Sequence, residues 1–159
     1  LDNGPIRTSF MLTYLPFAVN GDTVYETRTF YLDAGSQLNR VKEEYRGINK
    51  PFTVAAGIAE RPEGKITAKS AEKGYIAYTL DAGKNGTVYV GTIIPRNSTG
   101  ITESDSHLLI EELYTPGTEL VYYTGAGWSK WGFENDEAWV KYLNSFTERL
   151  NNPLKVTFK

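Results

Sequence analysis

Two charged side chains, Glu26 and Arg28, lie two residues apart in the stretch TVYETRTFYL, which is rich in β-branched and aromatic residues. Such a stretch is typical of a β-strand, and residues i and i+2 of a strand point to the same face. The spacing therefore predicts a carboxylate beside a guanidinium among apolar neighbours. The pair could bind sugar hydroxyls or a uronate carboxylate, with Glu26 as a candidate catalytic residue and Arg28 as a candidate binding residue. A cross-strand ion pair on a solvated sheet is the alternative.

The chain contains one histidine, His107, which follows a polar loop predicted at 97–105 and begins a predicted strand. Because an imidazole titrates near neutral pH, His107 is the second candidate for a catalytic acid or base. The alternative is an ordinary surface or capping residue. One histidine and no cysteine exclude a zinc site of several histidines, a disulfide and a cysteine nucleophile. No cofactor is predicted, although a metal held by carboxylates stays open.

A glycine-flanked aromatic segment, YYTGAGWSKWGF, occupies residues 122–133. Flat indole rings can pack on the C–H faces of sugars, and the lysine between Trp128 and Trp131 suits a uronate. We expect at least one of these two indoles to be partly exposed. The alternative is that both rings pack under the helix predicted next. The full set of candidate substrate-binding residues is Arg7, Arg28, Tyr123, Trp128, Lys130 and Trp131.

Strands must position these side chains, and the strongest strand signals come first in the chain. Residues 5–15, 23–32 and 38–45 are predicted to form a three-stranded antiparallel meander, with a turn at 20–22. The residues 115–118 predict a hairpin between the last two strands before the helix. The remaining predicted strands are 52–59, 66–70, 74–80, 86–95, 107–114, 119–124 and 154–158.

The spacing of apolar residues changes near Asn135. From Trp139 to Leu150 large apolar residues recur at spacings of four, three and four, which predicts a helix at 135–151. Asn135 or Glu134 would cap it. Many short strands with turns between them and one helix near the end predict a mainly β protein, an antiparallel β-sandwich.

The length and the net charge of the chain narrow the classes of binding partner. The chain has 159 residues, which allows one domain, and 17 basic against 19 acidic residues. A net charge of -2 gives no electrostatic reason to expect nucleic acid or an anionic membrane. No apolar run is long enough for a membrane span. The abrupt start at Leu1 suggests a trimmed or processed chain, or a fragment.

Three stretches resemble a known family: GPIRTSFMLTY at 4–14, ETRTFYLDAGSQLNRVKEEY at 26–45 and YYTGAGWSKWGFENDEAWVKYL at 122–143. They are similar to the later half of an uncharacterised family of exported proteins from polysaccharide-degrading gut bacteria. Its members resemble the galactose-mutarotase-like β-sandwich. The resemblance implies a broad antiparallel sheet and a periplasmic or cell-surface location. It carries over no catalytic residue, because the family has no established activity, and it implies a preceding β-rich half that is missing here.

These observations predict a carbohydrate-active protein of an exported glycan-degradation system, with a glycan or oligosaccharide bound in the groove of the sandwich. A polysaccharide lyase, a glycoside hydrolase and an epimerase-like enzyme stay open. The alternatives are a non-catalytic glycan-binding module and a purely structural one. Residues 1–159 would form a single β-sandwich domain or the later half of a larger one. In the second case, the missing half or a second copy would cover apolar sheet surface.

Overall fold

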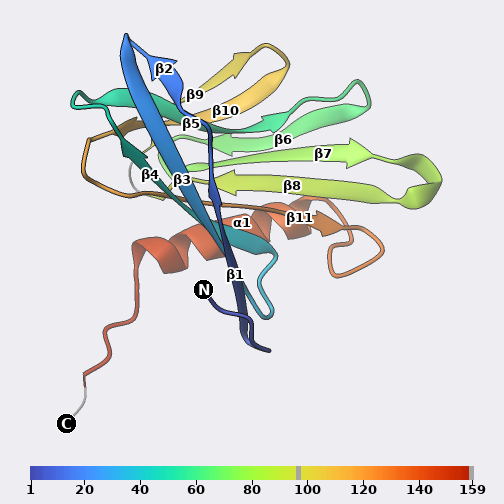
Figure 1. Ribbon diagram of the computed structural model, residues 1–159. Coiled ribbons are helices and arrows are strands. Elements are labelled where there is room, and N and C mark those ends of the chain that lie inside the picture. The colour runs from blue at the N-terminus through green and yellow to red at the C-terminus, as the bar shows by residue number, and fades with distance from the viewer. Residues whose placement is uncertain (96–97, 158–159) are drawn as a thin grey trace.

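The computed structural model describes residues 1–95 and 98–157 and shows two antiparallel sheets and one α-helix (Figure 1). The strands of the large sheet are β1 (Arg7–Thr13), β2 (Phe17–Val19), β3 (Asp22–Asp33), β4 (Leu38–Arg46), β6 (Gly64–Ser70), β7 (Tyr75–Asp81), β8 (Thr87–Ile93) and β11 (Leu120–Trp128). Those of the small sheet are β5 (Phe52–Ala59), β9 (Ser98–Ser104) and β10 (His107–Tyr114). The helices are α1 (Asp136–Asn151) and the short 3-10 helix η1 (Gly83–Asn85).

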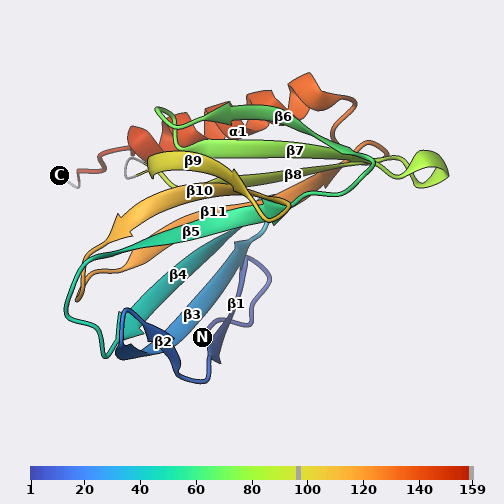
Figure 2. The same cartoon turned by 90° about the horizontal axis from the view of Figure 1, so that it is seen from above.

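The large sheet has the strand order β1-β3-β4-β11-β8-β7-β6, and β2 pairs with β3. The small sheet, in the order β5-β10-β9, packs on one face of the large one. Figure 2 shows α1 on the other side, along the half of the large sheet that contains β6, β7 and β8, while β1, β3 and β4 extend away from it. The predicted mainly β antiparallel sandwich is confirmed.

The first core lies between the two sheets. β5 and β10 alternate buried and more exposed residues, as a period of two requires for strands with one covered face. Leu108 and Ile110 of β10 are fully buried against Val41 and Ile76 of the large sheet. This core fixes the small sheet over β4, β11, β8 and β7, and so decides which part of the large sheet stays uncovered.

The second core lies between the large sheet and α1. The side chain of Asn135 accepts a hydrogen bond from the backbone of Ala138 at 2.9 Å, which confirms the predicted cap. Trp139 and Leu143 are fully buried on the sheet. Gly91 in β8 permits this close approach, because a Cβ atom there would lie 2.7 Å from Leu143. The helix therefore packs directly on backbone.

The predicted meander of 5–15, 23–32 and 38–45 is confirmed as β1, β3 and β4. The Asn20-Gly21 turn, with positive φ at both residues, joins β2 to β3. The pairing sets Leu12 opposite Arg28, and Arg28 opposite Glu43. Directly opposed residues of paired strands share a face, so these three side chains point to the side of the small sheet.

β1 is an edge strand, and its side of the large sheet is uncovered. Several large apolar side chains are exposed there, although they lie on the same face as the first core. We define the open face as the exposed or partly exposed side chains Phe10, Leu12, Tyr14, Arg28 and Leu32. That a further segment or a second copy covers this face stays a prediction.

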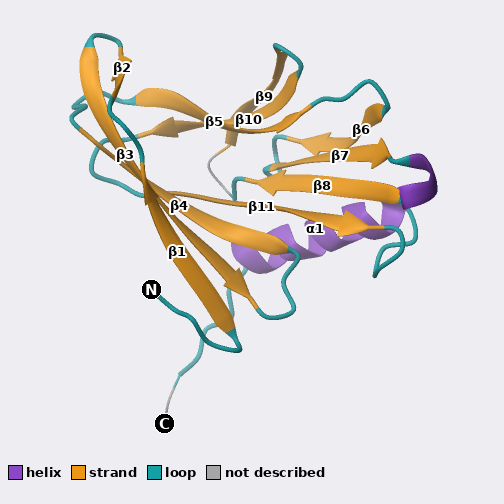
Figure 3. Cartoon of the chain, turned by 45° about the vertical axis from the view of Figure 1, so that its right-hand side comes forward, coloured by secondary structure: helices purple, strands orange, loops and turns teal. Residues whose placement is uncertain are grey.

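The predicted hairpin at 115–118 is wrong. β10 pairs with β5 and β9, whereas β11 pairs with β4 and β8, so the chain crosses from the small sheet to the large one at this turn. The turn residues indicate where the chain reverses, but they carry no information about which strands then pair. Figure 3 shows β10 and β11 in different sheets.

Three short segments differ between the predicted and the observed strands. The polar loop predicted at 97–105 is wrong over Ser98–Ser104, which form β9; Asn97 lies outside the described residues. β9 is an edge strand whose side chains are mostly polar and none of which is fully buried. It therefore lacks the alternation of apolar residues that predicts a strand. The last predicted strand is wrong over 154–157, which are exposed and form no strand, while Phe158 is not described. The short β2 was not predicted.

Candidate functional site

The candidate site is built around one arginine between two buried carboxylates. The Arg28 Nε donates to Glu26 Oε1, and lies 2.7 Å from Glu43 Oε1. Glu26 and Glu43 are 6% and 3% exposed, while the Arg28 side chain keeps 32% of its surface exposed. β3 supplies Glu26 and Arg28, as their spacing predicted, and β4 supplies Glu43. The carboxylates are thus buried, while the arginine side chain between them is partly exposed.

Two phenols complete what we call the charged cluster, which consists of Glu26, Arg28, Glu43, Tyr45 and Tyr122. The Tyr122 hydroxyl, from β11, donates to Glu43 Oε1 at 3.0 Å, and the Tyr45 hydroxyl, from β4, donates to Glu43 Oε2. Every oxygen of the Glu43 carboxylate therefore has a hydrogen-bond donor, as a buried charge requires.

Tyr14 closes one side of the cluster. Its ring lies under the Arg28 guanidinium, with 5.0 Å from the Arg28 Cζ to the ring centroid. Nearby, the Phe10 ring stacks on Phe30 at 4.7 Å between centroids, and half of Phe10 stays exposed. The reachable edge of Arg28 is therefore bordered by aromatic surface on the open face.

Burial dominates the electrostatics of the charged cluster. Burial raises the pKa of Glu43 above its usual value, against the lowering effects of the Tyr45 hydrogen bond and the Arg28 charge. Burial and the adjacent Glu43 charge raise the pKa of Tyr45 and of Tyr122, so both phenols stay protonated donors. For Arg28, burial opposes the charge, but Glu43 and Glu26 outweigh it and raise its pKa.

The arrangement is suited to binding an electron-rich group at Arg28. The two carboxylates hold the Arg28 Nε, and the side chain remains partly exposed on the open face. A sugar could place a hydroxyl or carboxylate on Arg28 and a ring face on Phe10 or Tyr14. Burial raises the pKa of Glu43, which makes it the carboxyl group of the cluster that holds a proton more readily than an exposed glutamate.

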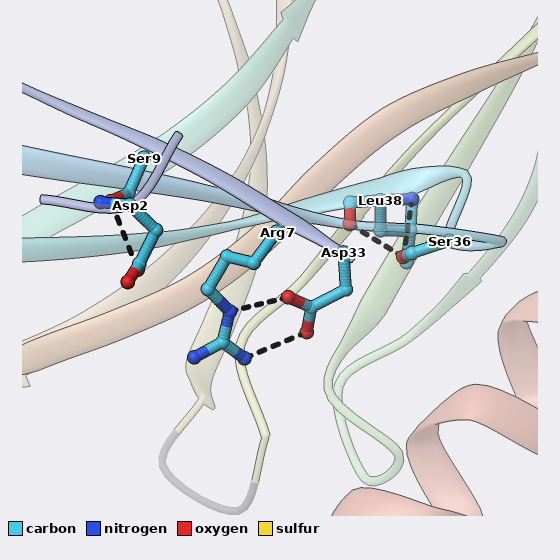
Figure 4. A network of polar contacts seen from close by, with 6 residues as sticks. All are labelled: Asp2, Arg7, Ser9, Asp33, Ser36 and Leu38. Carbon is cyan, nitrogen blue, oxygen red and sulfur yellow. Dashed lines mark hydrogen bonds and ion pairs between the residues drawn. The ribbon is translucent and has the colours of Figure 1, made fainter. Parts of the chain in front are cut away.

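Two predicted binding residues point away from this cluster. Arg7, at the start of β1, makes a bidentate contact with Asp33 at 2.5 and 2.9 Å (Figure 4). Its register position places it on the opposite face from Leu12 and Arg28. Tyr123 also points to the opposite face, where its ring packs on Phe146 at 5.2 Å. The structure therefore does not bring Arg7 or Tyr123 to Arg28.

His107 lies in the small sheet, at the turn between β9 and β10. It is exposed, and its Nδ1 lies 2.7 Å from the backbone oxygen of Asp105. Its strand partners are Ser104 and Ala59, which are also in the small sheet. His107 thus lies in the small sheet, whereas Glu26 contacts Arg28 in the large sheet, so the structure does not bring these two predicted catalytic residues together.

The aromatic segment lies at the end of β11, away from Arg28. Trp128 is 43% and Trp131 is 74% exposed, which confirms the expected exposure and makes the alternative of two buried rings wrong. Lys130 is exposed between them, and its ammonium lies 5.8 Å from the Trp128 ring centroid. The predicted site residues thus fall into separate groups: Glu26 contacts Arg28 in the charged cluster, and Lys130 and Trp131 contact Trp128 in the aromatic segment.

Sequence reasoning missed Glu43, Tyr45 and Tyr122 as site residues. In the predicted strand 38–45, Glu43 and Tyr45 share a face with the apolar Val41. A carboxylate on a face that is expected to be buried is a signal that could have identified Glu43. Which strand faces Arg28 depends on register, and no local pattern fixes it.

Fold and site together define a class: an antiparallel β-sandwich with a helix on its large sheet and a buried Glu–Arg–Glu–Tyr cluster beside an open apolar face. Residues 1–156 match the family described as "Domain of unknown function (DUF4861)", and the chain belongs to this family. It is also 27% identical to a protein of Formosa agariphila called "Uncharacterized protein P7". That alignment covers all of this chain and 41% of the relative, so the chain spans about two fifths of its length.

Two further observations bear on partners. Within the part of the chain that the structure describes, no helix is both long and apolar enough to cross a membrane. Within the same residues, no group of three or more histidine, aspartate or glutamate side chains is placed to hold a metal ion.

The raised pKa of Glu43 predicts a pH dependence of stability. The folded chain binds the Glu43 proton more tightly than the unfolded chain. Protonated Glu43 therefore adds to the free energy of unfolding. This stabilisation is complete below the ordinary glutamate pKa of about 4.3 and is lost as the pH rises through the raised pKa of the folded chain. In Glu43→Gln, this decrease in the free energy of unfolding should be absent, as urea unfolding at several pH values would show. Glu44→Gln, an exposed carboxylate on the opposite face, is the control; identical pH profiles for wild type and Glu43→Gln would contradict the prediction.

Proposed function

We propose that this chain is a carbohydrate-active protein of an exported glycan-degradation system, and that it binds a uronate-containing saccharide on the open face at Arg28. One observation carries the proposal: Arg28 is held by two buried carboxylates, yet a third of its side chain is exposed beside aromatic surface. A guanidinium fixed in this way binds a planar carboxylate without first losing its own conformational freedom.

The apolar surroundings favour a sugar over a small inorganic anion. Phe10 and Tyr14 offer ring surface on one side of Arg28, and Leu12 is exposed directly opposite it in the neighbouring strand. Sugars present both C–H faces and polar groups, and this combination matches an arginine bordered by exposed rings. The proposed galactose-mutarotase-like sandwich is in keeping with the antiparallel two-sheet architecture.

A second candidate is catalysis on the same sugar, as a lyase, hydrolase or epimerase-like enzyme. The observation in its favour is the raised pKa of Glu43, since general acids are tuned toward the working pH. Glu43 and Glu26 are buried beside Arg28. Binding of a sugar at Arg28 therefore needs no rearrangement of these side chains, whereas catalysis requires that the sugar gain access to Glu43. A turnover screen on uronate oligosaccharides separates the two.

The binding proposal is tested by calorimetry with oligogalacturonate and with a neutral oligosaccharide of the same length. We expect the acidic sugar to bind more tightly. Arg28→Lys keeps the charge between the two carboxylates but removes the planar fork, and should weaken binding of the acidic sugar at least tenfold while the chain stays folded. Arg40→Lys is the matched control, because Arg40 lies on the opposite face over the Tyr31 ring at 5.2 Å.

A second variant keeps the test decisive if Arg28→Lys unfolds. Phe10→Ala removes a half-exposed ring from the open face and should also weaken binding. The proposal fails if the acidic and neutral sugars bind equally, or if Phe10→Ala and Arg28→Lys both bind like wild type.

A further inference from the structure

The residues 128–133, which we call the tryptophan loop, expose apolar surface at a second place on the molecule. Trp128 and Trp131 are 43% and 74% exposed, whereas the third tryptophan, Trp139, is fully buried. Trp128 lies six positions after Tyr122 of the charged cluster in β11, which corresponds to about 20 Å along a strand. The two exposed indoles therefore belong to a surface of their own.

Hydrogen bonds hold the exposed part of this loop, Trp128 to Lys130, while Phe133 at its end is buried in the second core. The Trp128 Nε1 donates to the backbone oxygen of Asn85 at 2.8 Å, and the Lys130 Nζ donates to that of Lys84 at 2.6 Å. Ser129 exchanges bonds with Thr87: its Oγ accepts from the Thr87 nitrogen at 2.8 Å, and its nitrogen donates to the Thr87 oxygen at 2.9 Å. Figure 3 shows the loop after β11 at the same end of the large sheet as η1.

Glycine is required where the loop meets η1. Gly86 has a φ of +86°, and a Cβ atom there would lie 2.7 Å from Ser129 Oγ and 3.2 Å from Trp128 Nε1. Any larger residue would push the tryptophan loop off η1. The sequence thus fixes two exposed indoles in one arrangement, so little conformational entropy is lost when a ligand binds them.

Charges of both signs lie at this end, where Asp81 and Glu134 are exposed carboxylates, and the lysine beside the indoles is the group that could attract an anionic ligand. Lys84 and Lys130 are both exposed, and the Lys130 ammonium lies 5.8 Å from the Trp128 ring centroid. The adjacent Asp81 carboxylate accepts a bond from the Gly83 nitrogen within the η1 turn. A ligand that matches this surface has an apolar face for the indoles and a negative group for the lysines.

We propose that the tryptophan loop is a second saccharide-binding site, specific for acidic sugars, that acts independently of Arg28. The choice of a saccharide rests on the proposed function; the site itself rests on the fixed, exposed indoles and the two lysines. A long acidic glycan could then contact both the open face and the tryptophan loop, which would raise the overall affinity through effective concentration.

The indole N–H signals of the three tryptophans give a readout for each site in a nitrogen-labelled NMR spectrum. We expect oligogalacturonate to shift the Trp128 and Trp131 signals and to leave the buried Trp139 signal in place. Trp131→Ala should weaken binding at this site about fivefold or more, as the loss of one stacking ring does in comparable cases. Tyr25→Ala, which removes a half-exposed ring from β3, is the control and should bind like wild type.

Repeating the titration in Arg28→Lys separates this site from the proposed function. Shifts of Trp128 and Trp131 that persist in Arg28→Lys support the second site, whether or not Arg28 binds sugar. Binding that is lost in Arg28→Lys, with no indole shift in either chain, overturns it and leaves the Arg28 site standing. Indole shifts with the neutral oligosaccharide of equal size, or with anionic lipid vesicles in place of sugars, also overturn it.

Discussion

Replacing Arg28 with methionine should lower the free energy of unfolding by about 3 kcal/mol. The change removes the cation that contacts both Glu26 and Glu43 and leaves two buried carboxylates facing each other. Breaking a fully buried pair costs about 3–5 kcal/mol, and the partial exposure of Arg28 places this case at the lower end. Urea unfolding at neutral pH measures the loss.

The control for this variant is Arg40→Met, which removes an arginine of β4 from the opposite face, where it lies over the Tyr31 ring. It should stay within about 0.5 kcal/mol of wild type, as surface changes usually do. In Arg28→Met, a second change of Glu43→Gln should recover part of the loss, because it removes one uncompensated charge. If Arg28→Met is as stable as wild type, the charged cluster does not hold the large sheet together.

The charged cluster shows which contacts a local sequence pattern can predict and which it cannot. The i, i+2 spacing in TVYETRTFYL was enough to place Glu26 and Arg28 side by side on β3. Glu43 reaches them because β3 and β4 pair with Arg28 opposite Glu43. That register depends on the whole sheet and on the apolar residues of both strands. A pair within one strand could therefore be predicted, and its partner on the next strand could not.

The same limit explains the errors in topology. Strand positions follow from alternation and turn residues, and Phe52–Ala59 and His107–Tyr114 were predicted to the residue. The choice between two sheets is made by long-range burial, which the turn at 115–118 does not encode. His107 therefore lies in the small sheet, far along the chain and in a different sheet from the glutamate with which it was expected to act.

The tryptophans illustrate a case where two interpretations competed. Helical spacing assigned Trp139 to the core, and the structure buries it completely. For Trp128 and Trp131 the sequence allowed burial or exposure with equal plausibility. Hydrogen bonds from Trp128 to η1 and from β8 to Ser129 decide the matter, because they fix this part of the loop without burying the two indoles. Hydrogen bonds between distant segments leave no periodic signal in a sequence.

Trp139→Ala should lower the free energy of unfolding by about 3–5 kcal/mol. The Trp139 ring packs on Phe133 at 4.9 Å and Tyr142 at 5.4 Å between centroids, and its Nε1 donates to the Val90 oxygen at 3.2 Å. The Trp139 ring packs on the backbone of the large sheet at Gly127, where a Cβ atom would lie 2.9 Å from the indole. Because glycine has no side chain to move into the space, the cavity refills poorly from the sheet side, where the Tyr89 ring lies 6.5 Å from the Trp139 ring between centroids.

Trp131→Ala is the matched control, since it deletes the same side chain from a position that is 74% exposed. It should change the free energy of unfolding by no more than about 0.5 kcal/mol. Thermal and urea unfolding of the two variants side by side compare one core tryptophan with one surface tryptophan in the same chain. Equal losses in both variants would mean that the Trp131 ring itself contributes to the core, and the second saccharide site would then lose its structural basis.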